Sequence, residues 1–189
     1  MSKKNLARMT SVALVAASLL AACGKQEEKI EKAAATAASD AKATAEAAAK
    51  AARGAYAPYS RFKVGAALRI EDGPVVSGNN QENASFPAGC CAERTALHAA
   101  MAADPKAVVE SIAIVVPQVR GQRPVSPCGI CRQALLEQER RQESPIRVLM
   151  GITKGPVVEM YSVDSLLPLS FDAGQLPGRK RRKPTSGRG

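Results

Sequence analysis

Cysteine and glutamate side chains cluster in two short segments, Cys91-Ala92-Glu93 and Pro127-Cys128-Gly129-Ile130-Cys131. The second segment brings two thiols within reach of one metal ion, and Cys91 can supply a third. Three protein ligands leave the fourth tetrahedral position of a zinc ion open for water, which is typical of catalytic zinc. Glu93 lies two residues beyond Cys91, so its carboxylate can move protons beside that water without binding the metal.

The three cysteines fall at the starts of two predicted helices, over residues 91–103 and 129–140. A helix N-terminus carries partial positive charge, which lowers the pKa of a thiol and favours the thiolate that a metal needs. Two helix N-termini that face one another can therefore deliver three thiolates to one zinc ion.

The elements that must position these helices are short apolar runs. Strands are predicted at 62–68, 75–78, 111–116, 146–150 and 157–161, with a turn at 153–156 and a last short helix at 163–167. The order β-β-α-β-α-β-β predicts an α/β fold, with a mixed sheet of about five strands and helices packed on it.

The first 23 residues have the features of an export signal. Three basic residues precede a short apolar run, 9–22, which is too short to span a bilayer as a stable helix. The run ends in Leu20-Ala21-Ala22-Cys23, which resembles the lipobox of bacterial lipoproteins. The pattern predicts lipidation of Cys23 and a membrane-anchored protein that faces the periplasm. The alternative is a mis-assigned start on a cytosolic protein.

Composition divides the rest of the chain. Residues 24–52 are rich in Ala, Lys and Glu and predict a linker or helical stalk, followed by a catalytic domain over 53–175 and a basic, disordered tail over 176–189. The net charge is +10, but six basic residues lie in 178–189 and three in 1–22, with no acidic residue in either segment. The nearly neutral middle argues against a specific nucleic-acid-binding face.

Four segments occur in the order found in cytidine deaminases, which they resemble: residues 57–67, 80–84, 91–96 and 128–133. The zinc signature is that of the type with three cysteine ligands, and the resemblance covers about 53–175. It implies α-β-α layers, one zinc per chain and a homotetramer. It also implies hydrolysis of cytidine and deoxycytidine to uridine and deoxyuridine plus ammonia, by attack of zinc-activated water on C4, in pyrimidine salvage.

The resemblance implies roles for residues around the substrate. Glu93 would be the proton shuttle, while Asn80 and Glu82 would bind the ribose hydroxyls. Phe62 would pack against the nucleoside, and the main chain at Ala92 would contact the edge of the base.

Three further residues have implied supporting roles. Arg94 would donate hydrogen bonds to the zinc thiolates, because three thiolates overcompensate the charge of Zn²⁺ and weaken it as a Lewis acid. Arg132 would help in the same way. Phe171 resembles a residue that closes the site of a neighbouring subunit in tetrameric members.

Other readings of the same residues stay open. Cys128 and Cys131 can form a disulfide after export, and Cys90 is expected to be a small packed residue rather than a ligand. The competing functions are deamination of a cytosine-nucleoside antibiotic, and a non-catalytic surface lipoprotein with structural zinc or a redox CxxC pair. Glu93 argues against a structural site, which has no need of a carboxylate beside an open position.

Overall fold

The computed structural model describes residues 3–119, 123–151 and 157–177, with side chains from Gln26 onward. The chain divides into two compact units, Met1–Asp40 and Ala41–Gly189. The three α-helices are α1 (Lys3–Ala52), α2 (Ala92–Ala103) and α3 (Gly129–Gln142). The strands are β1 (Gly65–Ile70), β2 (Val75–Asn79), β3 (Val109–Val115), β4 (Arg147–Gly151) and β5 (Val157–Met160), and short 3-10 helices cover Phe86–Ala88, Val163–Leu166 and Ala173–Gln175.

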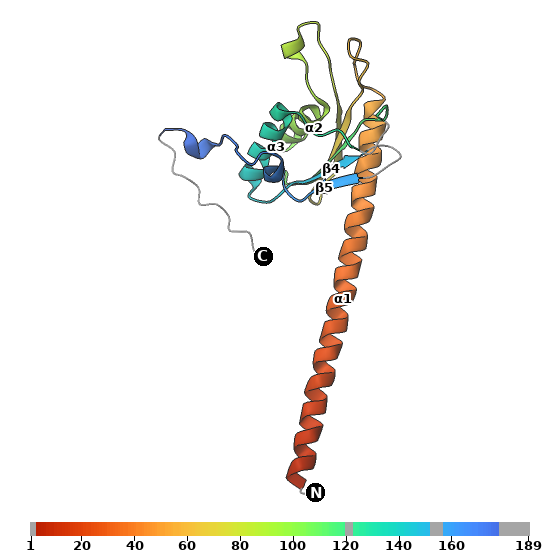
Figure 1. Cartoon of the computed structure of the whole chain (residues 1–189), viewed down its shortest axis with the longest axis vertical. Coiled ribbons are helices and arrows are strands. Elements are labelled where there is room, and N and C mark those ends of the chain that lie inside the picture. The colour runs from red at the N-terminus through yellow and green to blue at the C-terminus, as the bar shows by residue number, and fades with distance from the viewer. Residues whose placement is uncertain (1–2, 120–122, 152–156, 178–189) are drawn as a thin grey trace. The chain divides into compact units, whose positions relative to one another are not determined.

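Within the described residues, five strands form one mixed sheet in the order β2-β1-β3-β4-β5. Figure 1 labels β4 and β5 of this sheet, together with α2 and α3. β1 is antiparallel to both β2 and β3, and β4 is antiparallel to β5. β3 and β4 are parallel and are joined through α3, as a crossover between parallel strands requires. The predicted mixed sheet of five strands with helices packed on it is confirmed.

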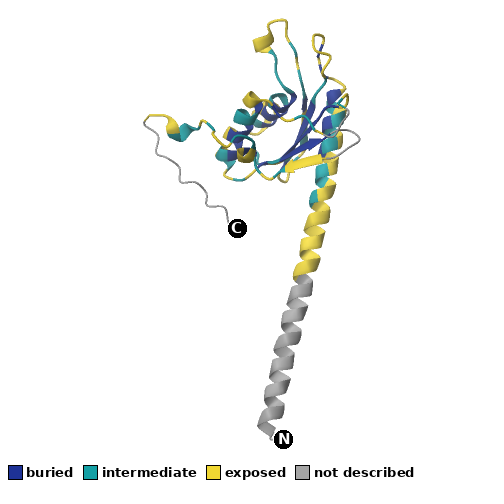
Figure 2. Ribbon diagram, viewed as in Figure 1, coloured by how far each residue is buried: buried dark blue, intermediate teal, exposed yellow. Residues whose placement is uncertain are grey.

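The two faces of the sheet are covered by different helices, because strand side chains alternate between faces. Leu68 of β1 and Ile112 and Ile114 of β3 pack in one apolar cluster with α2 and α3. Their neighbours Ala67 and Ala113 face the other way and pack with the end of α1. Figure 2 shows the resulting buried layers in dark blue.

The end of α1 belongs to the compact unit, although its composition indicates a stalk up to residue 52. Ala48 and Ala52 are buried, and the unit begins at Ala41 rather than near residue 53. Methyl groups are sufficient for this docking because the sheet offers an equally small surface. A Cβ atom at Gly65 would lie 1.9 Å from the carbonyl oxygen of Ala48, so any larger residue there would push the helix away.

A second glycine sets the position of α2. A Cβ atom at Gly78 of β2 would lie 2.4 Å from the amide nitrogen of Ala96 and 2.7 Å from the carbonyl oxygen of Ala92. The first turns of α2 therefore rest directly on the backbone of β2. This contact places the N-terminus of α2, which carries Cys91 and Glu93, at a defined height above the sheet.

The first unit, within the described side chains, is a polar helix. Residues 26–40 of α1 are almost all exposed, and Lys32 pairs with Glu28 at 2.8 Å one turn away. Among the described residues, no helix has both the length and the apolar character needed to cross a membrane. The predicted turn at 153–156 and the basic residues from 178 onward lie outside the described residues.

Candidate active site

The three predicted metal ligands meet at the N-termini of α2 and α3. Cys91 is the N-cap residue of α2, Cys128 is the N-cap residue of α3, and Cys131 lies in the first turn of α3. Their sulfur atoms all lie within 4.8 Å of one another. The structure thus places all three thiols where sequence reasoning expected them. Cys131 is buried, and Cys128 is exposed.

The sulfur positions fit a zinc ion. Zinc binds thiolate sulfur at about 2.3 Å, and tetrahedral geometry then separates two sulfurs by about 3.8 Å. The sulfurs of Cys91 and Cys128 are 3.8 Å apart. The same geometry leaves one tetrahedral position without a protein ligand from this trio.

The thiols of Cys91 and Cys131 have pKa values shifted in opposite directions. The pKa of Cys91 is lowered to about 5, first because Cys131 donates a hydrogen bond to its sulfur, with further lowering by Cys128 and Arg94. The same shared proton raises the pKa of Cys131. These hydrogen bonds favour a thiolate at Cys91, which is the charge state that a metal ligand needs.

Glu93 lies beside the sulfurs without joining them. Its side chain is only 4 % exposed, in the first turn of α2. Burial raises the pKa of this carboxyl, and the negative charge of Cys91 raises it further, while a hydrogen bond with Cys131 acts in the opposite direction. A buried carboxyl with a raised pKa next to a metal site is the usual arrangement for a group that accepts and returns protons.

The two arginines near the cysteines, Arg94 and Arg132, have different hydrogen-bond partners. Arg94 lies against the thiols: its charge and a hydrogen bond lower the pKa of Cys91, and its Nη2 donates to the carbonyl oxygen of Gly89 at 3.1 Å. Arg132 donates instead to Pro127 O at 2.8 Å, Leu166 O at 3.0 Å and Ser126 Oγ at 2.9 Å. Arg132 therefore braces the turn before Cys128, and these three hydrogen bonds go to two carbonyl groups and a hydroxyl rather than to a thiol.

The predicted nucleoside-binding residues come together in one loop region before β1 and after β2. Asn80 accepts a hydrogen bond from Val64 N at 2.8 Å and donates to Phe62 O at 2.9 Å. Glu82 accepts from Tyr59 N at 2.9 Å. The side chain of Asn80 thus binds the backbone just before β1, and the strand predicted over 62–68 starts at Gly65. Phe62 keeps 39 % of its surface exposed, and Ala92 is buried as the first residue of α2.

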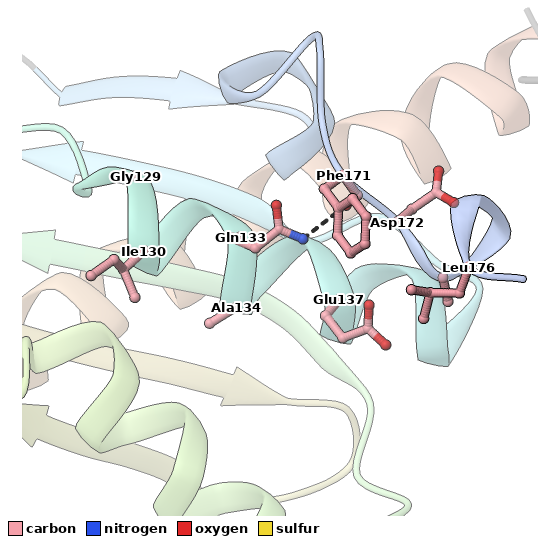
Figure 3. Close-up of a pocket in the computed structure, with 9 residues that line it drawn as sticks. Gly129, Ile130, Gln133, Ala134, Glu137, Phe171, Asp172 and Leu176 are labelled. Atoms are coloured by element: carbon pink, nitrogen blue, oxygen red, sulfur yellow. Dashed lines mark hydrogen bonds between the residues drawn. The ribbon is translucent and has the colours of Figure 1, made fainter.

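Phe171 lies apart from these residues, over the outer face of α3 (Figure 3). Gln133 of α3 donates to its carbonyl oxygen at 2.9 Å, and Arg140 of α3 holds the flanking Ser170 and Asp172 at 2.9 and 2.8 Å. Phe171 is 58 % exposed and, together with Ile130, lines a pocket of about 690 Å³. The chain therefore presents Phe171 outward.

Two contributions to the site were missed by sequence reasoning. Gly78 permits the close approach of α2 to β2. A glycine is required there because of the backbone of α2, which is distant in the sequence. Ser60 lies in the segment 57–67 that carries the family resemblance, yet it had no assigned role, and its hydroxyl contacts Glu82.

Cys90 was expected to lie outside the metal cluster, and its sulfur lies 3.7 Å from the carbonyl oxygen of Cys91, outside the trio of ligands.

Comparison with known proteins identifies the class that this fold and site define. Residues 38–143, more than half of the chain, match the family model for the cytidine and deoxycytidylate deaminase zinc-binding region. The chain belongs to the cytidine deaminase family of zinc-dependent deaminases.

Individual relatives agree with this assignment. The cytidine deaminase of Halalkalibacterium halodurans is 46 % identical over 120 residues, which are 64 % of this chain and 85 % of that protein. The crystal structure of cytidine deaminase from Burkholderia pseudomallei is 42 % identical with a TM-score of 0.60, over 69 % of this chain and 98 % of that one. The cytidine deaminase structure from Mycobacterium tuberculosis is 34 % identical with a TM-score of 0.53, over 69 % and 96 %.

Proposed function

We propose that this protein hydrolyses cytidine and deoxycytidine to uridine and deoxyuridine with release of ammonia, as a step of pyrimidine salvage. The observation that carries the proposal is the convergence of three sulfurs within 4.8 Å beside the buried carboxyl of Glu93. The relatives named cytidine deaminase, up to 46 % identical, support the choice of substrate.

Cys91, Cys128 and Cys131 are proposed to hold the zinc. When bound, zinc supplies a Lewis acid that lowers the pKa of water toward neutrality. Arg94 offsets part of the negative charge of the thiolates through the contact that lowers the pKa of Cys91. Arg132 keeps the turn before Cys128 in place through its three donated hydrogen bonds.

Glu93 is proposed to move the protons of the reaction. Its carboxylate takes a proton from the attacking water as the water oxygen bonds to C4, and delivers that proton to ring N3. It then takes the second proton of the same water and gives it to the amino nitrogen, so that the C4–N bond breaks and ammonia leaves as the C4 carbonyl forms. The burial that raises its pKa brings the carboxyl closer to the range in which it both accepts and donates protons.

The nucleoside is proposed to bind between the loops that carry Phe62, Asn80 and Glu82. Phe62 offers a partly exposed ring for packing, and Glu82 offers a carboxylate to the sugar. The N–H group of Ala92, the first residue of α2, has no intrahelical acceptor and can donate to the edge of the base.

A homotetramer is proposed from the resemblance and from the exposed position of Phe171. The residue is 58 % exposed although hydrogen bonds from Gln133 and Arg140 hold the segment around it. An aromatic side chain held in a fixed position but left uncovered suits a contact with a second copy, whose substrate site it would close.

One experiment tests the activity. The purified full-length chain is incubated with cytidine while its ultraviolet absorbance and the released ammonia are followed, and zinc is measured on the same sample. We expect steady conversion to uridine with about one zinc per chain. A sample with one zinc per chain that leaves cytidine unchanged would contradict the proposal and favour a different cytosine nucleoside or a structural zinc site.

Membrane anchoring through Cys23, facing the periplasm, is a separate proposal. Its support is the order of basic residues, apolar run and Ala21-Ala22-Cys23. The exposed, charged helix over residues 26–40 suits a spacer next to such an anchor.

The Cys23→Ser variant tests the anchor. We expect the original chain to sediment with membranes and to be released by detergent, whereas Cys23→Ser is not lipidated and leaves the lipid-anchored fraction. Mass spectrometry of the N-terminus is the measurement, and Cys90→Ser is the matched control, which should remain lipidated. A soluble cytosolic protein without acyl chains on Cys23 would rule the anchor out.

A further inference from the structure

Ser60 lies at the centre of a hydrogen-bond network that joins the predicted substrate residues. Its hydroxyl donates to Oε1 of Glu82, and its amide donates to Oε2 of the same carboxylate at 3.2 Å. Its Oγ also accepts a hydrogen bond from Phe62 N at 2.9 Å. Two residues proposed to bind the nucleoside, Phe62 and Glu82, are thus connected through one side chain.

The direction of each hydrogen bond follows from the available protons. A serine hydroxyl has one proton and two acceptor sites. Since Phe62 N–H occupies an acceptor site on Ser60 Oγ, and an ionised Glu82 can only accept, the single Ser60 proton points at Glu82. Ser60 therefore has no proton left for a substrate and can affect one only through Glu82 or Phe62.

The carboxylate of Glu82 has few hydrogen-bond acceptor sites left for a ligand. A carboxylate has about four lone-pair sites. Within the described residues, Oε2 accepts from Tyr59 N and Ser60 N, and Oε1 accepts from Ser60 Oγ. One acceptor site remains, on Oε1, and it can receive only a hydrogen-bond donor. A sugar hydroxyl satisfies this requirement, whereas a phosphate oxygen is repelled.

We propose that Ser60 is a positioning residue for sugar recognition, which holds the Glu82 carboxylate with one acceptor site directed at a hydroxyl of the nucleoside. This inference rests on the proposed deamination of cytidine and deoxycytidine. Because both are proposed substrates, the hydroxyl is one that they share, at C3′ or C5′ of the sugar.

Two further observations support this role. The hydrogen bond from Ser60 is the largest cause that lowers the pKa of Glu82, so the carboxylate remains ionised and acceptor-only over a wide pH range. Asn80 holds the other side of the same loop, because it contacts Phe62 O and Val64 N at 2.9 and 2.8 Å. The Phe62 backbone is therefore fixed at both its N–H and its carbonyl.

The test is Ser60→Ala in the full-length, zinc-loaded protein, with Ser60→Thr as the variant that keeps the hydroxyl. Ser77→Ala is the matched control, since Ser77 is an exposed serine on β2. KM and kcat are measured with cytidine, 2′-deoxycytidine, 3′-deoxycytidine and 5′-deoxycytidine. Zinc content and the thermal unfolding midpoint are measured for each variant.

We expect Ser60→Ala to raise KM for cytidine and 2′-deoxycytidine about tenfold, as for a hydrogen bond to a charged group. We expect kcat to change by less than about threefold. The increase should vanish with the one analogue that lacks the hydroxyl bound by Glu82, either the 3′-deoxy or the 5′-deoxy compound. Ser60→Thr should restore KM, and Ser77→Ala should resemble the original chain.

Several results would overturn the inference. An equal rise in KM with all four substrates would show that Ser60 does not act through one sugar hydroxyl. Loss of zinc or of the folded state in Ser60→Ala would make Ser60 a structural residue, and an unchanged KM would give it no role. In these cases the original chain still deaminates cytidine, whereas failure of the proposed function would leave the original, zinc-loaded chain inactive.

Discussion

The Glu93→Gln variant is expected to keep its zinc and to lose at least about 10⁴-fold in turnover. Glutamine preserves the size and much of the hydrogen-bonding reach of the side chain but cannot accept a proton. General acid–base groups typically contribute about 10²–10⁴-fold, and Glu93 is proposed to serve more than one proton transfer. Its carboxyl is buried beside Cys131, so solvent water is a poor replacement.

The measurement is single-turnover and steady-state conversion of cytidine, with zinc determined on the same preparation. Glu71→Gln, an exposed glutamate in the turn between β1 and β2, is the matched control and should keep full activity. Zinc retention in Glu93→Gln separates a catalytic role from a ligand role. A zinc-loaded variant with more than about a tenth of the original activity would show that Glu93 is not the proton shuttle.

The positions of the candidate ligands and of Glu93 are predictable from the sequence because most of them depend on local spacing. Cys91 and Glu93 lie within one helical turn, and Cys128 and Cys131 occupy the cap and the first turn of α3. Each helix start can be read from the sequence. The meeting of the two helix starts was a hypothesis, and the 3.8 Å between the sulfurs of Cys91 and Cys128 agrees with it.

Contacts between distant segments are not predictable in the same way. The alanine face of α1 has no large apolar side chain to mark it, and its docking depends on Gly65, Ala67 and Ala113 across the sheet. Arg132 was expected to support the thiolates, and its guanidinium donates to carbonyl groups on the turn before Cys128 and at Leu166. Side-chain direction here follows from tertiary structure rather than from a motif.

The structure of the loop before β1 also could not be predicted from the sequence pattern. Residues Phe62 to Val64 have the apolar, alternating pattern of a strand, but the paired register of β1 begins at Gly65. The side chains of Ser60 and Asn80 bind three of their backbone groups, and the carbonyl oxygen of Val64 accepts from the backbone of Asn80. Hydrogen bonds from polar side chains to the backbone cannot be recognised from hydrophobic periodicity, and here those side chains belong to the proposed nucleoside site.

The Cys128→Ala variant is expected to lose its zinc. The sulfurs of Cys91 and Cys128 lie at the separation that a shared zinc requires, and together with Cys131 they provide the three thiolates from two helices. Removing Cys128 leaves two thiol ligands, and metal affinity falls steeply because each ligand contributes to a site that also ties α2 to α3. We expect about one zinc per chain in the original protein and less than about a tenth in the variant after dialysis.

Thermal unfolding distinguishes loss of metal from general damage. A ligand that binds only the folded state raises the unfolding midpoint, so a chelator should lower the midpoint of the original chain and leave that of Cys128→Ala unchanged. Cys90→Ala is the matched control, because Cys90 is adjacent to a ligand but lies outside the trio, and it should retain both zinc and chelator sensitivity. A Cys128→Ala protein with one zinc per chain would exclude Cys128 as a ligand. A Cys128–Cys131 disulfide in active protein would exclude the three-thiolate site altogether, because a disulfide leaves neither sulfur as the thiolate that zinc binds.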